Sequence, residues 1–259
     1  MPADSVAEIR EHWDRQARNA TLSGAHVTHA DHNQRELEIE ILLQYLPRGQ
    51  RVLDVGCGNG FSTAILAPHA REVVGIDYSD AMIDRARREH GDLPNVRFDV
   101  QDVLALDLPA ASFDVAVSQR CLINLTSWER QQQALRHIAR VVRPGGCFIL
   151  QEGTRQGREA LNQAREALGL TRMPAVPFNL DFDETTLWPF LREDFDIVDV
   201  RRLGVYDLVS RIVHPLLVSP AEPTYDARIN DVARRVSACL RGADDLAREF
   251  SAFLRRKAQ

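Results

Sequence analysis

The sequence predicts an α/β fold in which helices cover a doubly wound, mostly parallel sheet. Short apolar runs rich in Val, Ile and Phe alternate with stretches of helical period, and this alternation is typical of such sheets. The 259 residues suit one large domain, or one domain with a small appendage. A hydrophobic content of 44% is sufficient for a sizeable core.

Seven runs have the length and composition of buried strands. They lie at residues 51–55, 72–76, 96–99, 113–118, 146–151, 195–201 and 249–255. Helical periodicity between them predicts helices near residues 61–67, 79–90, 127–142 and 157–168. The third helix has the clearest boundaries, because Thr126 and Glu129 fit a capping box and Pro144-Gly145-Gly146 ends the helical pattern.

Two regions stand outside this alternation. Residues 1–46 are helical, with Asp31 or Asn33 as a suitable cap for their second helix. Residues 204–246 separate the last two strands by a long insertion, which prolines interrupt in its first half. We therefore expect an N-terminal helical cover at 1–46, a sheet domain at 47–203 and 247–259, and a helical lid insertion at 204–246, of which residues 204–230 roof a ligand cavity.

Composition and charge argue against several classes of protein. The 32 basic and 37 acidic residues give a net charge of -5, which disfavours a nucleic-acid partner. The four cysteines lie far apart and form no CxxC pair, so neither a zinc site nor a disulfide framework is expected. The first residues lack the apolar core of a signal peptide, and no apolar run approaches a membrane span. We expect a cytoplasmic protein without membrane contact, and its oligomeric state stays open.

The segment TLSGAHVTHADHN carries His26, His29 and His32 at intervals of three. On a helix this spacing would suit a metal site, but the segment is punctuated like a loop. We therefore expect no bound metal and interpret the segment as a flexible lid that contributes one histidine to a substrate cavity. Trp13, in the preceding helix, is interpreted as a packing residue.

The run VLDVGCGNG places Gly56, Gly58 and Gly60 directly after the first strand. Glycines at these positions allow a sharp backbone turn against a ligand. Their spacing departs from the GxGxxG of dinucleotide sites. Asp77 ends the next strand about twenty residues later, where a carboxylate can accept both hydroxyls of a ribose. A glycine turn followed by a distant acid indicates a ligand of the adenosine type.

Four motifs extend this pattern, in order, across about residues 50–151: VLDVGCGNG, VVGIDYSDAMIDRARR, VRFDVQDVLALDLPAASFDVAVS and ARVVRPGGCFIL. Together they resemble successive motifs of the class I S-adenosylmethionine-dependent methyltransferases. The resemblance implies a Rossmann-like sheet of seven strands whose last strand, EFSAFLRR, is an antiparallel edge strand. It also implies S-adenosylmethionine as the cofactor.

The family's cofactor contacts can be carried over position by position. They imply Asp54, Gly56 and Gly58 at the methionine end, Asp77 at the ribose, Tyr78, Met82, Asp102 and Val103 at the adenine, and Ser118 and Gln119 beside the sulfonium. The glycine spacing and Asp102 together exclude a dehydrogenase.

The segments RCLINL, EGTRQGREALNQAREALGL, FNLDFDE and YDLVSRIVHPLL resemble a group of bacterial small-molecule methyltransferases. This resemblance implies methylation of an oxygen or nitrogen of a small molecule, in secondary metabolism or saccharide modification. Two alternatives remain, namely methylation of RNA or protein, and binding of the cofactor without catalysis. The substrate itself stays open.

Three residues are candidates for catalysis: Arg120, Glu152 and His214. Arg120 and Glu152 end adjacent strands, so the two side chains are expected to pair with each other. In the alternative interpretation, Arg120 holds an anionic group of the substrate, because a guanidinium suits oxyanions. His214 either contacts substrate or only shapes the turn before Pro215. Further polar candidates for the cavity are Asn124, Asn162, Arg165, Tyr206 and Arg211.

Overall fold

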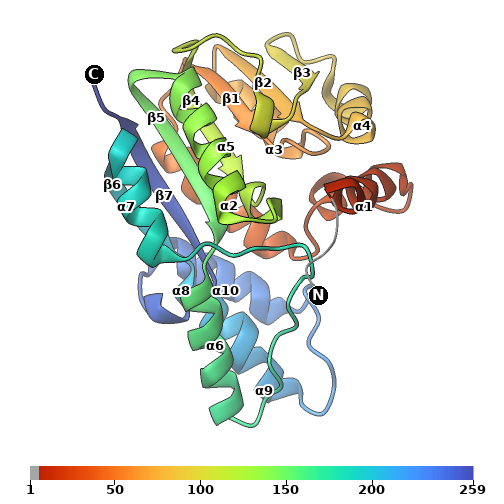
Figure 1. Ribbon diagram of the computed structural model, residues 1–259. Helices are drawn as coiled ribbons and strands as arrows, with labels where there is room; N and C mark the ends of the chain where they lie inside the picture. Colours follow the sequence, from red (N-terminus) through yellow and green to blue (C-terminus); the bar gives the residue numbers. More distant parts are fainter. Residues whose placement is uncertain (1–5, 259) are drawn as a thin grey trace.

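One seven-stranded sheet forms the centre of the computed structural model, which describes residues 6–258 (Figure 1). The strands are β1 (Arg51–Val55), β2 (Glu72–Asp77), β3 (Val96–Val100), β4 (Phe113–Gln119), β5 (Val142–Gly153), β6 (Phe195–Arg202) and β7 (Glu249–Arg256). All seven predicted strands are therefore confirmed. The largest difference is at β5, which begins at Val142 rather than at residue 146.

The strand order is β3-β2-β1-β4-β5-β7-β6. Strands β1 to β5 pair in parallel, whereas β7 runs antiparallel to both β5 and β6. The last strand is antiparallel, as predicted. It lies one position in from the edge, because β6 pairs along its outer side. The chain order changes direction between β1 and β4, the kind of point at which open α/β sheets bind ligands.

The longer helices are α1 (Val6–Arg18), α2 (His32–Tyr45), α3 (Phe61–Leu66), α4 (Asp80–His90), α5 (Trp128–Val141), α6 (Arg155–Ala167), α7 (Glu184–Asp194) and α10 (Arg228–Cys239). Shorter turns of helix are η1 (Gly24–Val27), η2 (Ala67–His69), η3 (Val103–Ala105), η4 (Leu122–Asn124), α8 (Gly204–Asp207), η5 (Leu208–Val213), α9 (His214–Val218) and η6 (Asp244–Leu246). The four predicted helices are present, and α7 was not predicted.

The first residues of α2 and α5 are capped at or beside the predicted positions. Asp31 caps α2 by accepting a hydrogen bond from the backbone N–H of Gln34 at 3.1 Å, as one of the two alternatives predicted. At α5 the prediction was wrong by one residue, because Ser127 rather than Thr126 is the cap. The Ser127 hydroxyl accepts from the N–H of Arg130 at 3.3 Å.

Alternate residues of each central strand face opposite layers of helices. In β1, Leu53 and Val55 belong to the apolar cluster that includes α5 and α7. Val52 belongs to the cluster on the other face, which includes α2 and α10. Because both faces are covered, the central strands are apolar on both sides, as is usual for parallel sheets.

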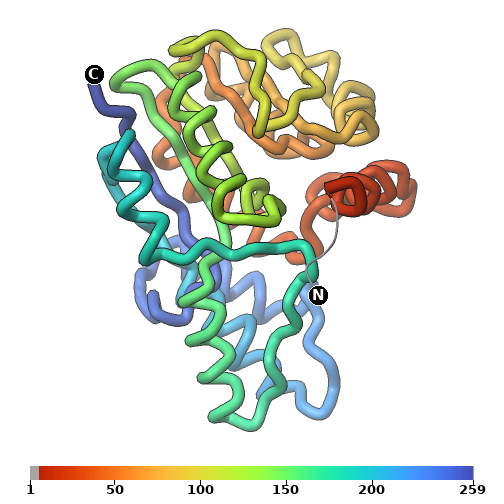
Figure 2. Tube along the Cα trace, in the orientation of Figure 1, coloured from red at the N-terminus to blue at the C-terminus, as the bar shows by residue number. Residues whose placement is uncertain are grey.

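The helices of the predicted insertion, α8 to α10, lie with α6 beyond one end of the sheet (Figure 1). The tube in Figure 2 shows the chain after α6 returning from this extension toward the region of α1 before it enters α7. None of the helices between residues 6 and 258 is long and apolar enough to cross a membrane.

Candidate functional site

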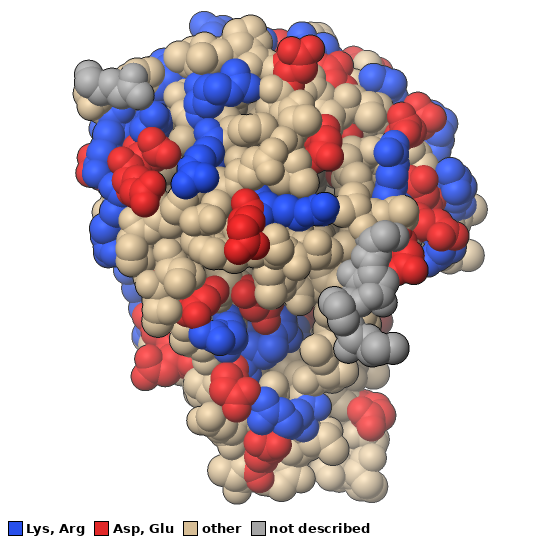
Figure 3. Space-filling model, in the orientation of Figure 1, with Lys and Arg blue, Asp and Glu red and all other residues tan. Residues whose placement is uncertain are grey.

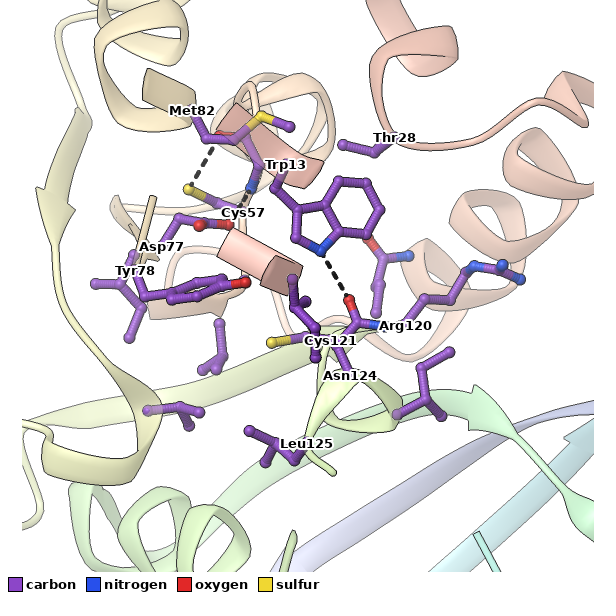
Figure 4. Close-up of a pocket in the computed structure, with 18 of the residues that line it drawn as sticks. Trp13, Thr28, Cys57, Asp77, Tyr78, Met82, Arg120, Cys121, Asn124 and Leu125 are labelled. Carbon is purple, nitrogen blue, oxygen red and sulfur yellow. Dashed lines mark hydrogen bonds between the residues drawn. The ribbon is translucent and has the colours of Figure 1, made fainter. Parts of the chain in front are cut away.

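A cavity of about 260 Å³ lies at the carboxyl ends of β1, β2 and β4. Its floor consists of the residues with which these strands end and of the turns that follow them. Its cover consists of three segments, namely the first half of α1, Thr28 with His29, and the stretch from Val176 to Asn179. Figure 4 shows side chains from the floor and the cover converging on this space.

The turn after β1 requires glycine for two reasons. Gly56 and Gly58 have φ values of +74° and +55°, in the left-handed region that other residues rarely adopt. The turn is also crowded from both sides. A Cβ atom on Gly56 would lie 2.4 Å from Cys121 Sγ, and one on Gly58 would lie 2.8 Å from Thr28 Cγ2. Both glycines line the cavity, so a ligand there meets bare backbone.

Asp77 presents its carboxylate to the cavity from the end of β2 (Figure 4). One oxygen accepts the N–H of Gly58 at 3.0 Å, and the other accepts the N–H of Ser79 at 2.9 Å. Burial raises the pKa of Asp77 to about 6, although these two donors oppose the rise. The group is therefore mainly ionised at neutral pH, and each oxygen retains acceptor capacity.

Eight of the predicted cofactor-binding residues line the cavity: Gly56, Gly58, Asp77, Tyr78, Met82, Asp102, Val103 and Gln119. The other two lie behind the lining. Asp54 is 2% exposed and accepts the Thr63 hydroxyl at 2.6 Å. The Ser118 hydroxyl donates to Glu152 at 3.4 Å.

Arg120 also lines the cavity, at the end of β4, with a φ of +55° that is uncommon for a residue other than glycine. Its Nη1 forms an ion pair with Glu249 of β7. The expected pairing of Arg120 with Glu152 is therefore wrong. Among residues 6–258, Glu249 is the only acceptor for the Arg120 guanidinium, whose side chain is 26% exposed.

Glu152 has a different partner, namely the backbone of η4. Its carboxylate accepts the N–H groups of Cys121, Leu122 and Ile123 at 3.1, 2.8 and 3.3 Å. Burial raises the pKa of Glu152 to about 8, while these donors and Arg120 oppose the rise. The structure thus places Glu152 beneath the turn that carries Cys121, outside the lining of the cavity.

His214 is also outside the cavity lining, because it lies buried at the start of α9 in the extension beyond the sheet. Of the three predicted catalytic residues, only Arg120 reaches the cavity.

Tyr206 and Arg211 belong to a buried network that joins α8 and η5 to the start of α2, and Arg165 and Asn162 of α6 bond to the loop that follows this helix. The Tyr206 hydroxyl donates to Asp31 at 2.8 Å, and Arg211 forms an ion pair with the same carboxylate. Arg165 donates from Nε to the Thr171 carbonyl at 2.9 Å. Asn162 accepts the N–H of Met173 at 2.9 Å. These side chains are explained by internal hydrogen bonds, whereas Asn124 does line the cavity.

The cover of the cavity differs from the one predicted. The indole of Trp13 donates to Asn124 at 3.1 Å, and its ring meets Phe178 edge-on with centroids 6.1 Å apart. The first contact joins α1 to η4, and the second joins α1 to the chain between α6 and α7. Among the described residues, none from 204–246 lines the cavity, because α10 packs on α2 and the other helices of the insertion lie in the extension.

Several lining residues had no role in the sequence analysis. Arg35, on α2, donates from Nη2 to the Ser62 hydroxyl at 2.6 Å and faces the cavity beside the glycine turn. Cys57 and Cys121 also line it, and burial raises the pKa of both thiols well above the usual value. The sequence could not single out Arg35, because arginine is common throughout this chain. Its position at the cavity depends on how α2 packs against the strand ends, which is a feature of the tertiary structure.

The three histidines of the segment at 26, 29 and 32 take different positions. The rings of His26 and His32 contact each other, with centroids 5.7 Å apart. His29 instead lines the cavity, and its side chain is almost fully buried.

Comparison with known proteins identifies a methyltransferase domain at residues 52–146. A protein of Mycolicibacterium smegmatis named as a probable S-adenosylmethionine-dependent methyltransferase is 36% identical over 102 residues. This match covers 39% of the present chain and only 37% of the relative. The S-adenosyl-L-methionine-dependent Diels-Alderase iccD of Talaromyces variabilis is 28% identical over 207 residues, covering 76% of this chain and 70% of that one.

Among solved structures, the N-methyltransferase NodS from Bradyrhizobium japonicum, in complex with S-adenosyl-L-homocysteine, superposes with a TM-score of 0.59. The superposition covers 96% of this chain and 98% of NodS, at 16% identity. This likeness concerns the fold.

Proposed function

We propose that this chain, which carries a class I S-adenosylmethionine-dependent methyltransferase domain, transfers a methyl group to an oxygen or nitrogen of a small molecule. The observation that carries the proposal is the position of Asp77. Its carboxylate lies in the cavity beside the bare backbone of Gly56 and Gly58, where an adenosine can bring its ribose hydroxyls.

The lining residues suit each part of the cofactor. Asp77 would accept the ribose hydroxyls, Asp102 would accept the adenine amino group, and Tyr78 and Met82 would flank the ring. Arg35 would meet the carboxylate of the methionine part, because its guanidinium faces the cavity close to the glycine turn. When bound, the cofactor supplies a methyl group on a positively charged sulfur. The protein then has to align a nucleophile and exclude water.

A small substrate is favoured by the cover over the cavity. The indole of Trp13 and the ring of Phe178 line the cavity and contact each other, so a compact acceptor fits better than an exposed site on RNA or protein. The face shown in Figure 3 mixes acidic and basic side chains and has no continuous basic stripe for a nucleic acid. By resemblance of the segments that follow β4 and β5, we place the reaction in bacterial secondary metabolism or saccharide modification.

A second candidate is cofactor-assisted cyclisation without methyl transfer. It is favoured by one observation, that the match to iccD extends over 76% of this chain, whereas the M. smegmatis match covers 39%. The two functions differ in their products. Methyl transfer consumes S-adenosylmethionine and forms S-adenosylhomocysteine, whereas cyclisation leaves the cofactor unchanged.

Calorimetry with S-adenosylmethionine and S-adenosylhomocysteine tests the proposed site. Both should bind to the wild type, and Asp77→Asn should weaken binding while the protein stays folded. Liquid chromatography with mass spectrometry on a panel of hydroxylated and amine acceptors then separates methyl transfer from cyclisation. Absence of cofactor binding by the folded wild type would refute the proposed function.

A further inference from the structure

The segment Gly24–Asp31 lies directly over the glycine turn. The side-chain amide of Asn59 donates to the Gly24 carbonyl at 3.2 Å, and Thr28 contacts the turn through the position that a Cβ of Gly58 would occupy. These contacts fix the segment against the part of the cavity where the methionine end of the cofactor would lie. His29 follows Thr28 in this segment, and its side chain lines the same cavity.

The His29 imidazole has the burial and the position of a side chain that contacts a ligand. It lines the cavity with only 8% of its surface exposed. Its Nδ1 is enclosed by protein and has no hydrogen-bond partner of normal geometry among residues 6–258, although the nearby backbone of Asp31 raises the pKa of the ring slightly. Buried polar atoms are normally paired, so an imidazole that lines a cavity and lacks a protein partner is a candidate to contact a ligand.

Burial, together with two nearby arginines, favours the neutral form of His29. Burial lowers the pKa of His29 well below 6.5, and Arg120 and Arg35 lower it further, while Glu249 opposes them. Arg120 follows the last residue of β4, Arg35 lies on α2 and Glu249 begins β7, so charged groups from three parts of the fold act on the ring. A neutral imidazole can accept a proton, as a base must.

The donors of Arg120 and the apolar cover of the cavity indicate the chemistry of the methyl acceptor. The ion pair with Glu249 uses Nη1 of Arg120, and the guanidinium has no other acceptor among the described residues, so its remaining donors are free for an electron-rich oxygen. The cover is apolar, since it is formed largely by Val6, Ile9, Trp13, Val176 and Phe178. The cavity therefore combines a polar inner end with an apolar mouth.

We propose that His29 is the proton acceptor of the reaction, and that the substrate is a hydroxylated molecule with an apolar body whose oxygen is held by Arg120. This inference rests on the proposed function and narrows it to methylation of oxygen. The substrate oxygen forms a bond to the methyl carbon, and the carbon–sulfur bond breaks with its electron pair passing to sulfur. The hydroxyl proton moves to His29 and then to water.

The test compares His29→Gln with His26→Gln, a control in the same segment whose ring contacts His32 instead of lining the cavity. Phenols with apolar substituents and amines of the same shape are supplied with S-adenosylmethionine. We expect the wild type and His26→Gln to methylate the phenols. His29→Gln should be slower by about 100-fold or more with unchanged affinity for S-adenosylhomocysteine. Added imidazole should partly restore a His29→Ala variant, which a merely structural role would not allow.

A second measurement does not depend on turnover. In nitrogen-15 spectra of the wild type loaded with S-adenosylhomocysteine, the His29 ring should be neutral at neutral pH and should shift when 4-nitrophenol is added, whereas the His26 ring should not. A His29 ring that is charged at neutral pH or unmoved by the phenol overturns the proposal. So does methylation of amines alone, or an undiminished rate in His29→Gln. Each of these results would leave methyl transfer itself intact, whereas a wild type that fails to bind the cofactor would refute the proposed function.

Discussion

Arg120 at the end of β4 forms its ion pair with Glu249 at the start of β7. The pairing follows from the sheet, because antiparallel β7 runs beside β5 and sets Glu249 opposite Gly153. Glu38 of α2 lies next to this pair, and burial together with the charge of Glu249 raises its pKa to about 8. Arg120 at the polar end of the cavity is therefore supported from behind by the Glu249 carboxylate and by the protonated carboxyl group of Glu38.

Glu249→Gln should lower the free energy of unfolding by about 3 kcal/mol, because it leaves the largely buried guanidinium of Arg120 without its counter-charge. Urea denaturation measures the change. Glu72→Gln is the matched control, since the Glu72–Arg51 pair is about a third exposed and should contribute less than about 1 kcal/mol. Equal losses in the two variants would contradict the buried pair.

Glu38 should make stability fall as the pH rises from 4.5 to about 8. Its pKa is raised in the folded state, so its favourable contribution is complete below the unfolded value of 4.5 and is lost as the pH passes through about 8. Glu38→Gln mimics the protonated acid and should gain stability relative to the wild type across this range. Urea titrations of both proteins at several pH values give the difference. A constant difference would show that Glu38 is already ionised beside Glu249.

Asp77→Ala should weaken binding of S-adenosylmethionine by roughly 1.5–3 kcal/mol, as expected for the loss of a charged acceptor. The affinity of the wild type should rise as the pH increases through about 6. The carboxylate form of Asp77 accepts hydrogen bonds from both ribose hydroxyls, whereas the protonated form has fewer acceptor positions. Calorimetry at one pH below 6 and one pH above 6 measures both effects. An identical pH profile for the two proteins would exclude Asp77 from the binding site.

Gly58→Val should abolish cofactor binding and leave the sheet folded. A valine there would adopt an unfavourable φ of +55° and push Thr28 away from the turn. Gly49→Ala is the control, because Gly49 has a φ of +70° with no atom within 4 Å of its added Cβ. Circular dichroism and calorimetry report fold and binding. Normal binding by folded Gly58→Val would mean that the turn does not approach the ligand.

Hydrogen exchange should slow in α1 and in Gly24–His29 when S-adenosylhomocysteine binds, because these segments cover the cavity. Residues 204–230 should change little, since the cavity lining among the described residues includes none of them. Mass spectrometry of peptic fragments resolves the two regions. Protection centred on 204–230 would restore the lid first expected for the insertion.

Local patterns were sufficient for much of the fold. The strands were predictable because a strand buried on both faces must be apolar along its whole length, as Val52 and Leu53 illustrate. Helix α7 was not predicted, because it contains Pro189 and because its cap, Asp183, is recognisable only in the structure. The alignment of Gly56, Gly58 and Asp77 was also predictable, since strand ends of a parallel sheet share one edge.

By itself the sequence determined the seven strands, the helices between the first five of them, the glycine turn and the carboxylate at the end of β2, because periodicity and backbone conformation are local properties. Only the tertiary structure decided the partner of Arg120, which lies 129 residues away in the chain, and the approach of Arg35 and His29 to the cavity. These contacts depend on how α2 and β7 pack against the sheet. No spacing in the sequence encodes that packing, because buried charges pair with whichever partner the packing brings within reach.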